Sequence, residues 1–441
     1  MAPGPPSLPV VGHLPAFLRD KLGFLTRAAE RYGDVVRLDI GRTTFLLNDP
    51  DAIHHVLVAN HANYGKTPRL TSRRGQRLSG KGLLTRSGTD HLLHRRRLQP
   101  IFHGPAVAFL ADRIVESADR FMDRWSDGQE LDLGREMMLW AHRIMGRLLF
   151  STDYEAEGRR LGDAVLIRRR HLQYVYGSLL PFPEYWPRPI TLRYRRAMSR
   201  TDHALCGMIR ERRRSANPPP DLLTMLIRSS DRDGAFMTDR QIRDEALTLS
   251  VTGYETLGEA LAWTWWLLAS HPTIEDSFRA HISGALPGRR PGIADLPRLD
   301  YIERVLNEAL RLYPPTWIFV RIAYGEDTLP GGTRIPAGSK LYLCPYVTHR
   351  RPDFYPAPER FDPERFTAQA VGGRPRYAFF PFGGGPRVCI GESLGRMEGV
   401  LLLARTAQRA RFELLPDQLV VPHPGLTLTP SPGIRVRVRL E

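Results

Sequence analysis

Cysteine is scarce in this chain of 441 residues. Only Cys206, Cys344 and Cys389 are present, and they lie far apart in the sequence. Disulfide frameworks and four-cysteine metal sites need more cysteines at closer spacings, so the sequence excludes both. A functional cysteine in this chain must therefore act singly.

Long apolar runs are also missing. A membrane-spanning helix needs ~20 consecutive apolar residues, whereas the richest run covers only residues 261–269. The N-terminus contains Pro3, Pro5, Pro6 and Pro9 and has no basic segment followed by an apolar one, which excludes a secretory signal there. We therefore expect a cytoplasmic protein without a membrane anchor.

Acidic residues and lysine are both under-represented. Lys and Arg together number 63 against 47 Asp and Glu, which gives a formal charge of +16. Only four of those 63 residues are lysines, so arginine supplies the rest. The short basic runs at 95–97, 168–170 and 212–214 fall in helix-like contexts, which favours a solvated basic surface over a nucleic-acid site. We predict no nucleic-acid partner.

Composition and periodicity together predict the fold class. Hydrophobic residues make 42% of the chain and charged residues 25%, as in soluble globular proteins. Neither a repeat nor a low-complexity linker divides the chain, so we expect a single domain over 1–441. Apolar spacing predicts a helix over 17–31, a mostly helical stretch over 89–285, a hairpin over 35–47 and an alternating strand over 434–440. We expect a mainly α fold with a small β portion.

The sharpest chemical signal follows a long irregular stretch, 351–386, which is rich in proline, glycine and aromatic residues. Residues 382–391 read F-G-G-G-P-R-V-C-I-G and precede a helix-like segment. Glycines on both sides of Cys389 allow the backbone to approach closely, and the N-terminal amides of the next helix favour a thiolate. The pattern suits a thiolate that binds a metal. It lacks the G-x-G-x-x-G spacing of a dinucleotide loop.

This pattern, F-x-x-G-x-R-x-C-x-G, resembles the haem-binding motif of the cytochrome P-450 family, the haem-thiolate monooxygenases, in their soluble bacterial type. Its fixed positions are matched by Phe382, Gly385, Arg387, Cys389 and Gly391. The resemblance implies one haem b with Cys389 as the axial iron ligand, Phe382 near the sulfur and Arg387 on a haem propionate. It also implies the cytochrome P-450 fold, in which the haem lies between a long distal helix and the cysteine-loop helix.

A second motif pairs Glu308 with Arg311. The two residues are three apart in a helix-like segment and share one helix face, as many solvated ion pairs do. The family, however, pairs an E-x-x-R helix with an arginine in a downstream P-x-R-F segment, matched here by Arg365 within 363–366. The resemblance therefore implies a buried structural network of these three residues beneath the haem.

A third motif, T-G-Y-E-T at 252–256, lies in a helix-like run over 238–269. Back-bonded threonines and a glycine that leaves room for a groove or bulge are compatible with helical packing alone. Adjacent helical residues diverge by ~100°, so Glu255 and Thr256 point to different places. Because the family has G-x-[DE]-T across the distal haem face, the resemblance implies two catalytic residues: Thr256 facing bound oxygen and Glu255 in a solvent-linked proton relay. Thr252 stands where the family commonly has alanine or glycine.

Haem propionates are anionic and need hydrogen-bond donors. His91 and Arg95 are four residues apart and lie on one helical face. The family has an H-x-x-x-R arrangement at this place and a further arginine downstream, matched by Arg321. The resemblance therefore implies that all three residues bind the haem.

Residues 75–82 nearly spell a phosphate-binding loop, but Gly82 replaces the Ser or Thr that would hold Mg²⁺ and no strand precedes the segment. We expect a mobile loop, which the resemblance places over the substrate pocket. The other expected pocket walls are Tyr64–Leu84, Leu166–Pro189, Val251, Thr316–Val320 and Leu426–Leu428.

The resemblance implies a monooxygenase that inserts one oxygen atom from O₂ into a C–H bond of an apolar small molecule, such as a terpenoid, polyketide or fatty acid. The alternative is the same haem chemistry used for oxidative coupling, cyclisation or rearrangement. No flavin or nicotinamide fingerprint is visible, so we expect no fused reductase. Electrons from NAD(P)H would then come through a ferredoxin or flavodoxin with its reductase. We expect that partner to dock over the thiolate side, guided by Arg387, Arg396 and residues 95–97.

Overall fold

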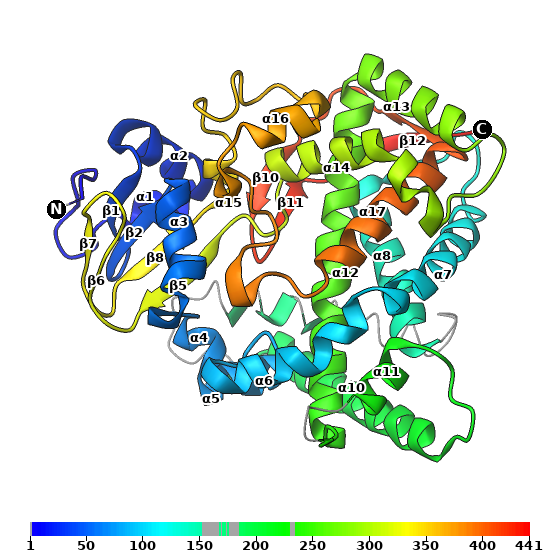
Figure 1. Cartoon of the computed structure of the whole chain (residues 1–441), viewed down its shortest axis with the longest axis horizontal. Coiled ribbons are helices and arrows are strands. Elements are labelled where there is room, and N and C mark those ends of the chain that lie inside the picture. The colour runs from blue at the N-terminus through cyan, green and yellow to red at the C-terminus, as the bar shows by residue number, and fades with distance from the viewer. Residues whose placement is uncertain (1, 152–166, 169, 173, 176–184, 230–233) are drawn as a thin grey trace.

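The computed structural model describes residues 2–441 except 152–166, 169, 173, 176–184 and 230–233. Helices make up most of the molecule, and a five-stranded sheet lies beside the N-terminal helices (Figure 1). Helix α12, Asp239–Ser270, runs through the middle of the helical part. The prediction of a mainly α fold with a small β portion is confirmed.

The other described helices precede or follow α12 in the chain. Those before it are α1 (Leu14–Arg19), α2 (Lys21–Tyr32), α3 (Pro50–His54), α4 (Pro68–Thr71), α5 (Arg73–Ser79), α6 (Gly88–Leu98), α7 (Pro105–Met122), α8 (Leu133–Phe150), α10 (Pro189–Arg214) and α11 (Leu222–Arg228). Those after it are α13 (Pro272–Ala285), α14 (Asp300–Leu312), α15 (Pro345–Thr348), α16 (Ala368–Gly372) and α17 (Glu392–Ala407).

The central helix is defined by its cap and by its apolar surface. Thr238 and Gln241 form a capping box, in which each side chain accepts a hydrogen bond from the backbone N–H of the other. The C-terminal half is mostly apolar and therefore buried, with Trp263 and Trp265 in the core. α12 packs mainly on α8 and also contacts α10, α14 and α17.

Within the described residues, the β portion contains one large and three small sheets. The strands of the large sheet occur in the order β1 (Val35–Asp39), β2 (Thr43–Leu47), β8 (Lys340–Leu343), β5 (Phe319–Ala323) and β3 (Tyr64–Gly65). β1 and β2 are antiparallel and joined by a short turn, which confirms the predicted hairpin. The small sheets are β4 (Glu130–Asp132) with β12 (Arg435–Leu440) and β9 (Ala410–Leu414), β10 (Val421–Pro424) with β11 (Leu428–Ser431), and β6 (Asp327–Thr328) with β7 (Arg334–Ile335).

Two local predictions differ from the structure. The helix predicted over 17–31 is broken at Asp20, whose carboxylate accepts the N–H of Gly23 over 2.9 Å and so starts α2 as an N-cap. The expectation of a mobile loop over 75–82 is wrong. Its first part is helix α5, and the N–H of Lys81 then donates to Asp244 on α12 over 3.1 Å. A Cβ on Gly82 would lie 2.1 Å from the hydroxyl of Thr248, so this glycine allows close packing against α12.

Among the described helices, none combines the length and the apolar character that crossing a bilayer requires.

Candidate active site

Cys389 lies in a tight loop of residues 380–391, here called the Cys loop. The N–H of Cys389 donates to the C=O of Phe382 over 2.9 Å and closes this loop around its glycines. Gly385 has a φ of +66°, and a Cβ there would lie 1.8 Å from the C=O oxygen of Leu57 in the π-helix η1 (His55–Ala59). Only glycine meets both requirements, so the sequence of this loop is fixed by its backbone shape and by η1.

Cys389 is exposed, so a ligand can reach its thiol. The thiol nevertheless lies in a recess, because the surrounding protein shields it from bulk water. This burial raises the pKa of the thiol, and the N–H of Gly391 and the charge of Arg95 lower it by smaller amounts. The amides at the start of α17 therefore act in the predicted direction, but they do not by themselves produce a thiolate. A metal ion that coordinates the sulfur would remove the proton.

Five basic side chains from four segments interact electrostatically beside the Cys loop. Four of them are the residues that the sequence predicted to hold a cofactor, and the fifth, Lys66, was missed: His91 and Arg95 on α6, Arg321 on β5, Arg387 in the Cys loop and Lys66 after β3. Burial and the other cations lower the pKa of His91 to about 3, so its imidazole is neutral at pH 7. Burial and Arg387 lower the pKa of Arg321 to about 10.

His91 is neutral and the other four groups are cations, and the described residues supply no carboxylate partner to any of them. None of the five forms an ion pair with a carboxylate of the described residues, and Nη1 of Arg387 is buried without a hydrogen-bond acceptor. The existing contacts are to backbone carbonyls: Arg95 donates to Val388 over 2.6 Å, and Lys66 donates to Leu84 over 2.8 Å. Buried positive charges without anions are costly. A ligand with two carboxylates would offset this cost, so the cluster fits the two propionates of haem b.

A cavity of about 270 Å³ opens beside the cluster. Its lining includes His91, Arg321 and Arg387 together with the apolar side chains of Val56 and Leu57. Cationic and apolar groups in one wall suit the carboxylate-bearing edge of an otherwise apolar macrocycle.

On the central helix, three threonines at i, i+4 and i+8 form a ladder of hydrogen bonds. The hydroxyl of Thr256 donates to the C=O of Thr252 over 2.8 Å, and that of Thr252 donates to the C=O of Thr248 over 2.9 Å. Thr252 is exposed although it lies in the middle of α12. Gly253 does not open a bulge: α12 is regular there, and a Cβ on Gly253 would lie 2.7 Å from Met145 of α8. The glycine therefore serves helix packing.

Glu255 points elsewhere than Thr256, as the helical geometry predicted. Its side chain is buried, and Oε1 accepts the hydroxyl of Thr427 over 2.9 Å. Thr427 lies in the turn between β10 and β11. The structure thus brings a carboxylate of α12 against the turn of the β10–β11 hairpin.

Glu308 and Arg311 form a fully buried pair on α14. The guanidinium donates to both carboxylate oxygens, over 2.7 and 2.8 Å, and also donates to the C=O of His349 over 3.0 Å. Arg365 approaches the same carboxylate at 3.5 Å. Burial raises the pKa of Glu308, and the Arg311 guanidinium opposes that shift. The three-residue network implied by the sequence is confirmed, and it fixes the irregular stretch after residue 351 to α14.

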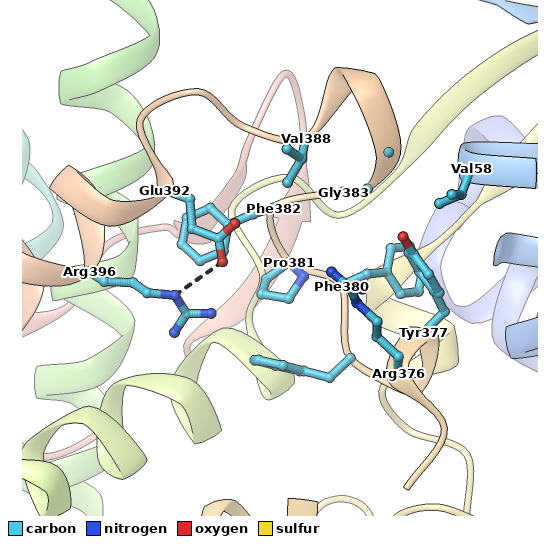
Figure 2. Close-up of a pocket in the computed structure, with 13 residues that line it drawn as sticks. Val58, Arg376, Tyr377, Phe380, Pro381, Phe382, Gly383, Val388, Glu392 and Arg396 are labelled. Carbon is cyan, nitrogen blue, oxygen red and sulfur yellow. Dashed lines mark hydrogen bonds and ion pairs between the residues drawn. The ribbon is translucent and has the colours of Figure 1, made fainter. Parts of the chain in front are cut away.

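The outer side of the Cys loop contains a second cavity of about 280 Å³ (Figure 2). Phe382 lies at its edge, and the guanidinium of Arg396 sits 4.9 Å from the centre of that ring. Arg396 also donates to Glu392 over 3.2 Å and to Asn307 over 2.7 Å. Arg396 is therefore held by neighbours within the molecule, and Arg387 belongs to the cation cluster. The side chain of Arg396 is still 26% exposed, so the expectation that these two arginines guide a partner stays a prediction.

Some expected pocket walls cannot be placed. Leu166 and residues 176–184 lie outside the described residues. Among the rest, Val251, Thr316 and Val320 are half-buried.

Lys66 gave no motif signal in the sequence, and its position is decided by the fold. We expect Lys66→Met to speed the loss of haem by about tenfold, the factor that corresponds to one hydrogen bond to a charged group. Transfer of haem from the holoprotein to excess apomyoglobin measures this rate. Lys340→Met is the control, because Lys340 belongs to β8 and contacts the C=O of Ile40. Equal rates in the two variants would contradict the role of Lys66.

Comparison with known proteins agrees with this geometry. Residues 2–438 match the family profile described as cytochrome P-450. Cyclooctatin synthase from Streptomyces melanosporofaciens is 34% identical, with 98% of this chain and 94% of that protein covered. Pentalenene oxygenase from Streptomyces avermitilis is 32% identical, with 99% and 96% covered. The solved heme domain of cytochrome P-450DA has a TM-score of 0.89 at 25% identity and covers 100% of this chain and 98% of that one. The chain belongs to the cytochrome P-450 family of monooxygenases.

Proposed function

We propose that this enzyme hydroxylates a terpenoid by inserting one oxygen atom of O₂ into a C–H bond. The observation that carries the substrate class is its similarity along nearly the whole chain to proteins named as a cyclooctat-9-en-7-ol 5-monooxygenase and a pentalenene oxygenase, which are terpenoid-modifying by name. Half-buried apolar side chains at two expected pocket positions, Val251 and Val320, support an apolar substrate.

The residues of this chain would act on two sides of a haem: one group would bind the haem, and the other would deliver protons. His91, Arg95, Arg321, Arg387 and Lys66 would hold the propionates, and Cys389 would bind the iron. Haem b with a thiolate ligand supplies the activation of O₂, because the thiolate favours cleavage of the O–O bond. On the other side we place Thr256. Its hydroxyl donates a hydrogen bond to the C=O of Thr252, so the lone pairs of Oγ1 are free to accept a hydrogen bond from a proton-donating water.

Glu255 is the proposed second proton-transfer residue. Thr427 fixes one oxygen of its carboxylate by a hydrogen bond of 2.9 Å. We propose that protons reach the distal side through this carboxylate, with Thr427 setting its orientation.

The substrate class is tested by adding cyclic terpenes to the purified holoenzyme. Binding of the true substrate displaces water from the iron and shifts the Soret band, whereas a polyketide or fatty acid of similar size should leave the band unchanged. Turnover in isotopically labelled O₂ then separates hydroxylation from coupling, cyclisation or rearrangement, because only hydroxylation incorporates the label. A shift caused by charged ligands alone would contradict the proposal.

We expect Thr256→Ala to keep haem binding and substrate binding but to reduce product formed per NAD(P)H consumed by about tenfold or more, with hydrogen peroxide released instead. The reason is that Thr256 would act only after O₂ binds. Thr256→Ser should restore coupling, because it keeps the hydroxyl. Thr264→Ala is the control, since Thr264 makes the same bond to its own helix, over 2.7 Å to Ala260, inside the core. Unchanged coupling in Thr256→Ala would contradict the assignment.

We propose that electrons from NAD(P)H arrive through a separate ferredoxin or flavodoxin and its reductase. Arg96 is exposed on α6, the helix whose Arg95 bonds to the Cys loop. Arg376 is exposed at the rim of the outer cavity beside the same loop. Both are suited to attract an acidic partner, whereas the neighbouring Arg97 is only half exposed.

Reversing the charge of Arg96 should slow the first electron transfer from an acidic ferredoxin several-fold at low salt and have little effect at high salt, because exposed charges are screened within ~10 Å at 0.1 M salt. Stopped-flow reduction of the substrate-bound Arg96→Glu enzyme measures this. The matched control is Arg214→Glu, an exposed charge at the end of α10. A rate that depends on neither salt nor Arg96 would contradict electrostatic docking.

A further inference from the structure

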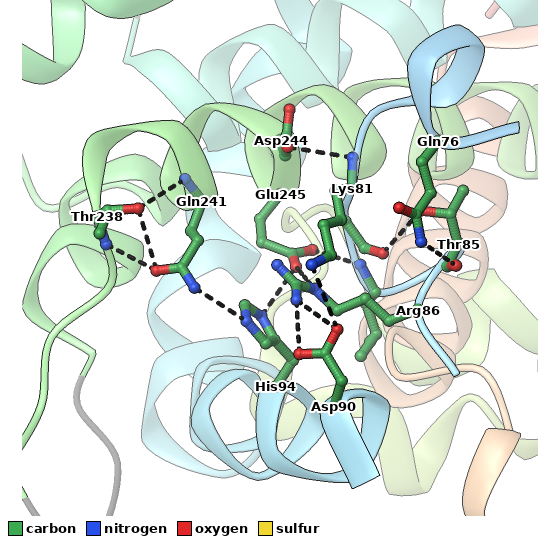
Figure 3. Close-up of polar contacts among 12 residues, drawn as sticks. Gln76, Lys81, Thr85, Arg86, Asp90, His94, Thr238, Gln241, Asp244 and Glu245 are labelled. Atoms are coloured by element: carbon green, nitrogen blue, oxygen red, sulfur yellow. Dashed lines mark hydrogen bonds and ion pairs between the residues drawn. The ribbon is translucent and has the colours of Figure 1, made fainter. Parts of the chain in front are cut away.

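A buried carboxylate on the central helix joins two segments that both contact the Cys loop. Glu245 lies in the N-terminal part of α12, ten residues before Glu255, and its side chain is fully buried (Figure 3). Figure 3 shows it between the segment 80–86, which leads out of α5, and helix α6.

Each oxygen of this carboxylate has its own contact. Oε2 accepts the N–H of Leu83 over 2.9 Å. Oε1 lies 3.2 Å from Nδ1 of His94 and 3.8 Å from Nε of Arg86. His94 and Arg86 are themselves buried. One carboxylate thus accepts a hydrogen bond from a backbone amide and faces an imidazole and a guanidinium as charge contacts, without a hydrogen bond to either. These groups come from two segments far from it in the sequence.

Both segments reach the Cys loop directly. The C=O of Arg86 accepts a hydrogen bond from Arg387 over 3.0 Å. Arg95, the residue after His94, donates to the C=O of Val388 over 2.6 Å. Arg86, which faces Glu245, thus contacts Arg387 itself. His94, which also faces Glu245, is the neighbour of the residue that contacts Val388.

The charges around Glu245 make it hard to replace. The guanidinium of Arg86 is buried and also donates to both oxygens of Asp90, over 2.7 and 2.8 Å. Asp90 is nearly half exposed, so Glu245 is the buried anion that faces Arg86. Losing one partner of a buried charged contact leaves the other uncompensated. The segment and α6 would then shift to find new partners.

We propose that Glu245 is a positioning residue that sets the haem-binding geometry of the Cys loop through Arg86 and His94. This proposal rests on haem binding by Cys389 and the cation cluster, and it is independent of the substrate. Through it the distal helix, the segment 80–86 and the propionate cations are held as one unit, so a shift of α12 is transmitted to the ligand side of the haem.

The test compares Glu245→Gln with Asp244→Asn in purified holoenzyme. Asp244 is the matched control because it is the adjacent residue, is also buried, and also accepts an amide of the same segment, that of Lys81 over 3.1 Å. It has no contact with His94 or Arg86 in the described structure.

Two readouts apply: the rate of haem transfer to excess apomyoglobin, and the fraction of the reduced carbon monoxide complex that keeps the red-shifted Soret band of thiolate ligation. We expect Glu245→Gln to lose haem about tenfold faster than the wild type and to show a smaller thiolate fraction, because the buried negative charge that faces Arg86 is removed. Asp244→Asn should remain within about twofold of the wild type, because it leaves the contacts to α6 intact. Circular dichroism checks that both variants are folded.

Equal effects of the two variants would overturn the proposal, because anchoring of the segment alone would then explain them. Wild-type haem retention in Glu245→Gln would also overturn it. If Glu245→Gln does not fold, His94→Leu and His94→Asn replace it. The leucine removes the polar ring nitrogen that faces Glu245 and should weaken haem retention, whereas the asparagine amide keeps a polar group near the position of Nδ1 and should restore it. Failure of the terpenoid assignment would alter neither readout.

Discussion

Replacing Cys389 with alanine is expected to abolish the red-shifted Soret band of the reduced carbon monoxide complex and to eliminate product formation. The sulfur of Cys389 is accessible at its own surface, and two members of the cation cluster, Lys66 and Arg95, interact with it electrostatically. Without the sulfur the iron loses the ligand that favours O–O cleavage. Difference spectroscopy of the reduced protein with carbon monoxide measures the loss.

The other two cysteines provide the controls. Cys344 is buried, its thiol contacts the C=O of Trp317 at 3.1 Å, and burial raises its pKa to about 12. Cys206 lies on α10, outside the cation cluster. Cys206→Ala and Cys344→Ala should therefore both keep the band. If either of them lost it while Cys389→Ala kept it, the ligand assignment would be wrong.

A comparably large effect is expected from Arg311→Lys. Lysine keeps the charge but cannot donate to both oxygens of Glu308 and also reach the C=O of His349, so part of a fully buried network is left unpaired. Breaking a buried ion pair costs about 3–5 kcal/mol, a large share of the ~5–15 kcal/mol that stabilises a domain. We expect little holoprotein, and unfolding by guanidinium at a clearly lower concentration.

The pH dependence of that variant has a predicted sign. Burial raises the pKa of Glu308, and Arg311 opposes the shift in the wild type. With a weaker partner the folded-state pKa rises further above its unfolded value of about 4.3. A carboxyl whose pKa is raised on folding loses stability as pH rises, so the deficit of Arg311→Lys should grow from about pH 4.3 upward. Unfolding measured at several pH values checks this.

Arg304→Lys is the matched control on the same helix. Arg304 donates to Glu364 over 2.8 Å and to Asp300 over 3.1 Å, and both of these carboxylates are exposed to solvent. Exposed pairs contribute about 0–1 kcal/mol, so this variant should remain near the wild type. Similar losses in Arg304→Lys and Arg311→Lys would show that α14 tolerates no change at all, and would contradict a specific role for the buried network.

The local chemistry of this protein was determined by the sequence. The closure of the Cys loop at Gly385, the pairing of Glu308 with Arg311 and the divergence of Glu255 from Thr256 depend on nearby residues, whereas the packing of the Cys loop on η1 does not. Their relative geometry follows from helical repeats and from the φ that glycine alone adopts freely. The predicted central helix could be bounded to within a residue because its cap and apolar surface are local features.

The contacts between distant segments were decided only by the tertiary structure. Lys66 joins the cation cluster, and Glu245 contacts Leu83 and His94. Arg396 packs on the ring of Phe382 and donates a hydrogen bond to Asn307. No spacing in the sequence encodes these partners, because an arginine or lysine on a helix has the same local pattern whether it faces water or a buried carboxylate. Whether a charge is a binding group, a structural partner or part of the surface depends on which segments pack around it, since desolvation and pairing arise only in the packed fold.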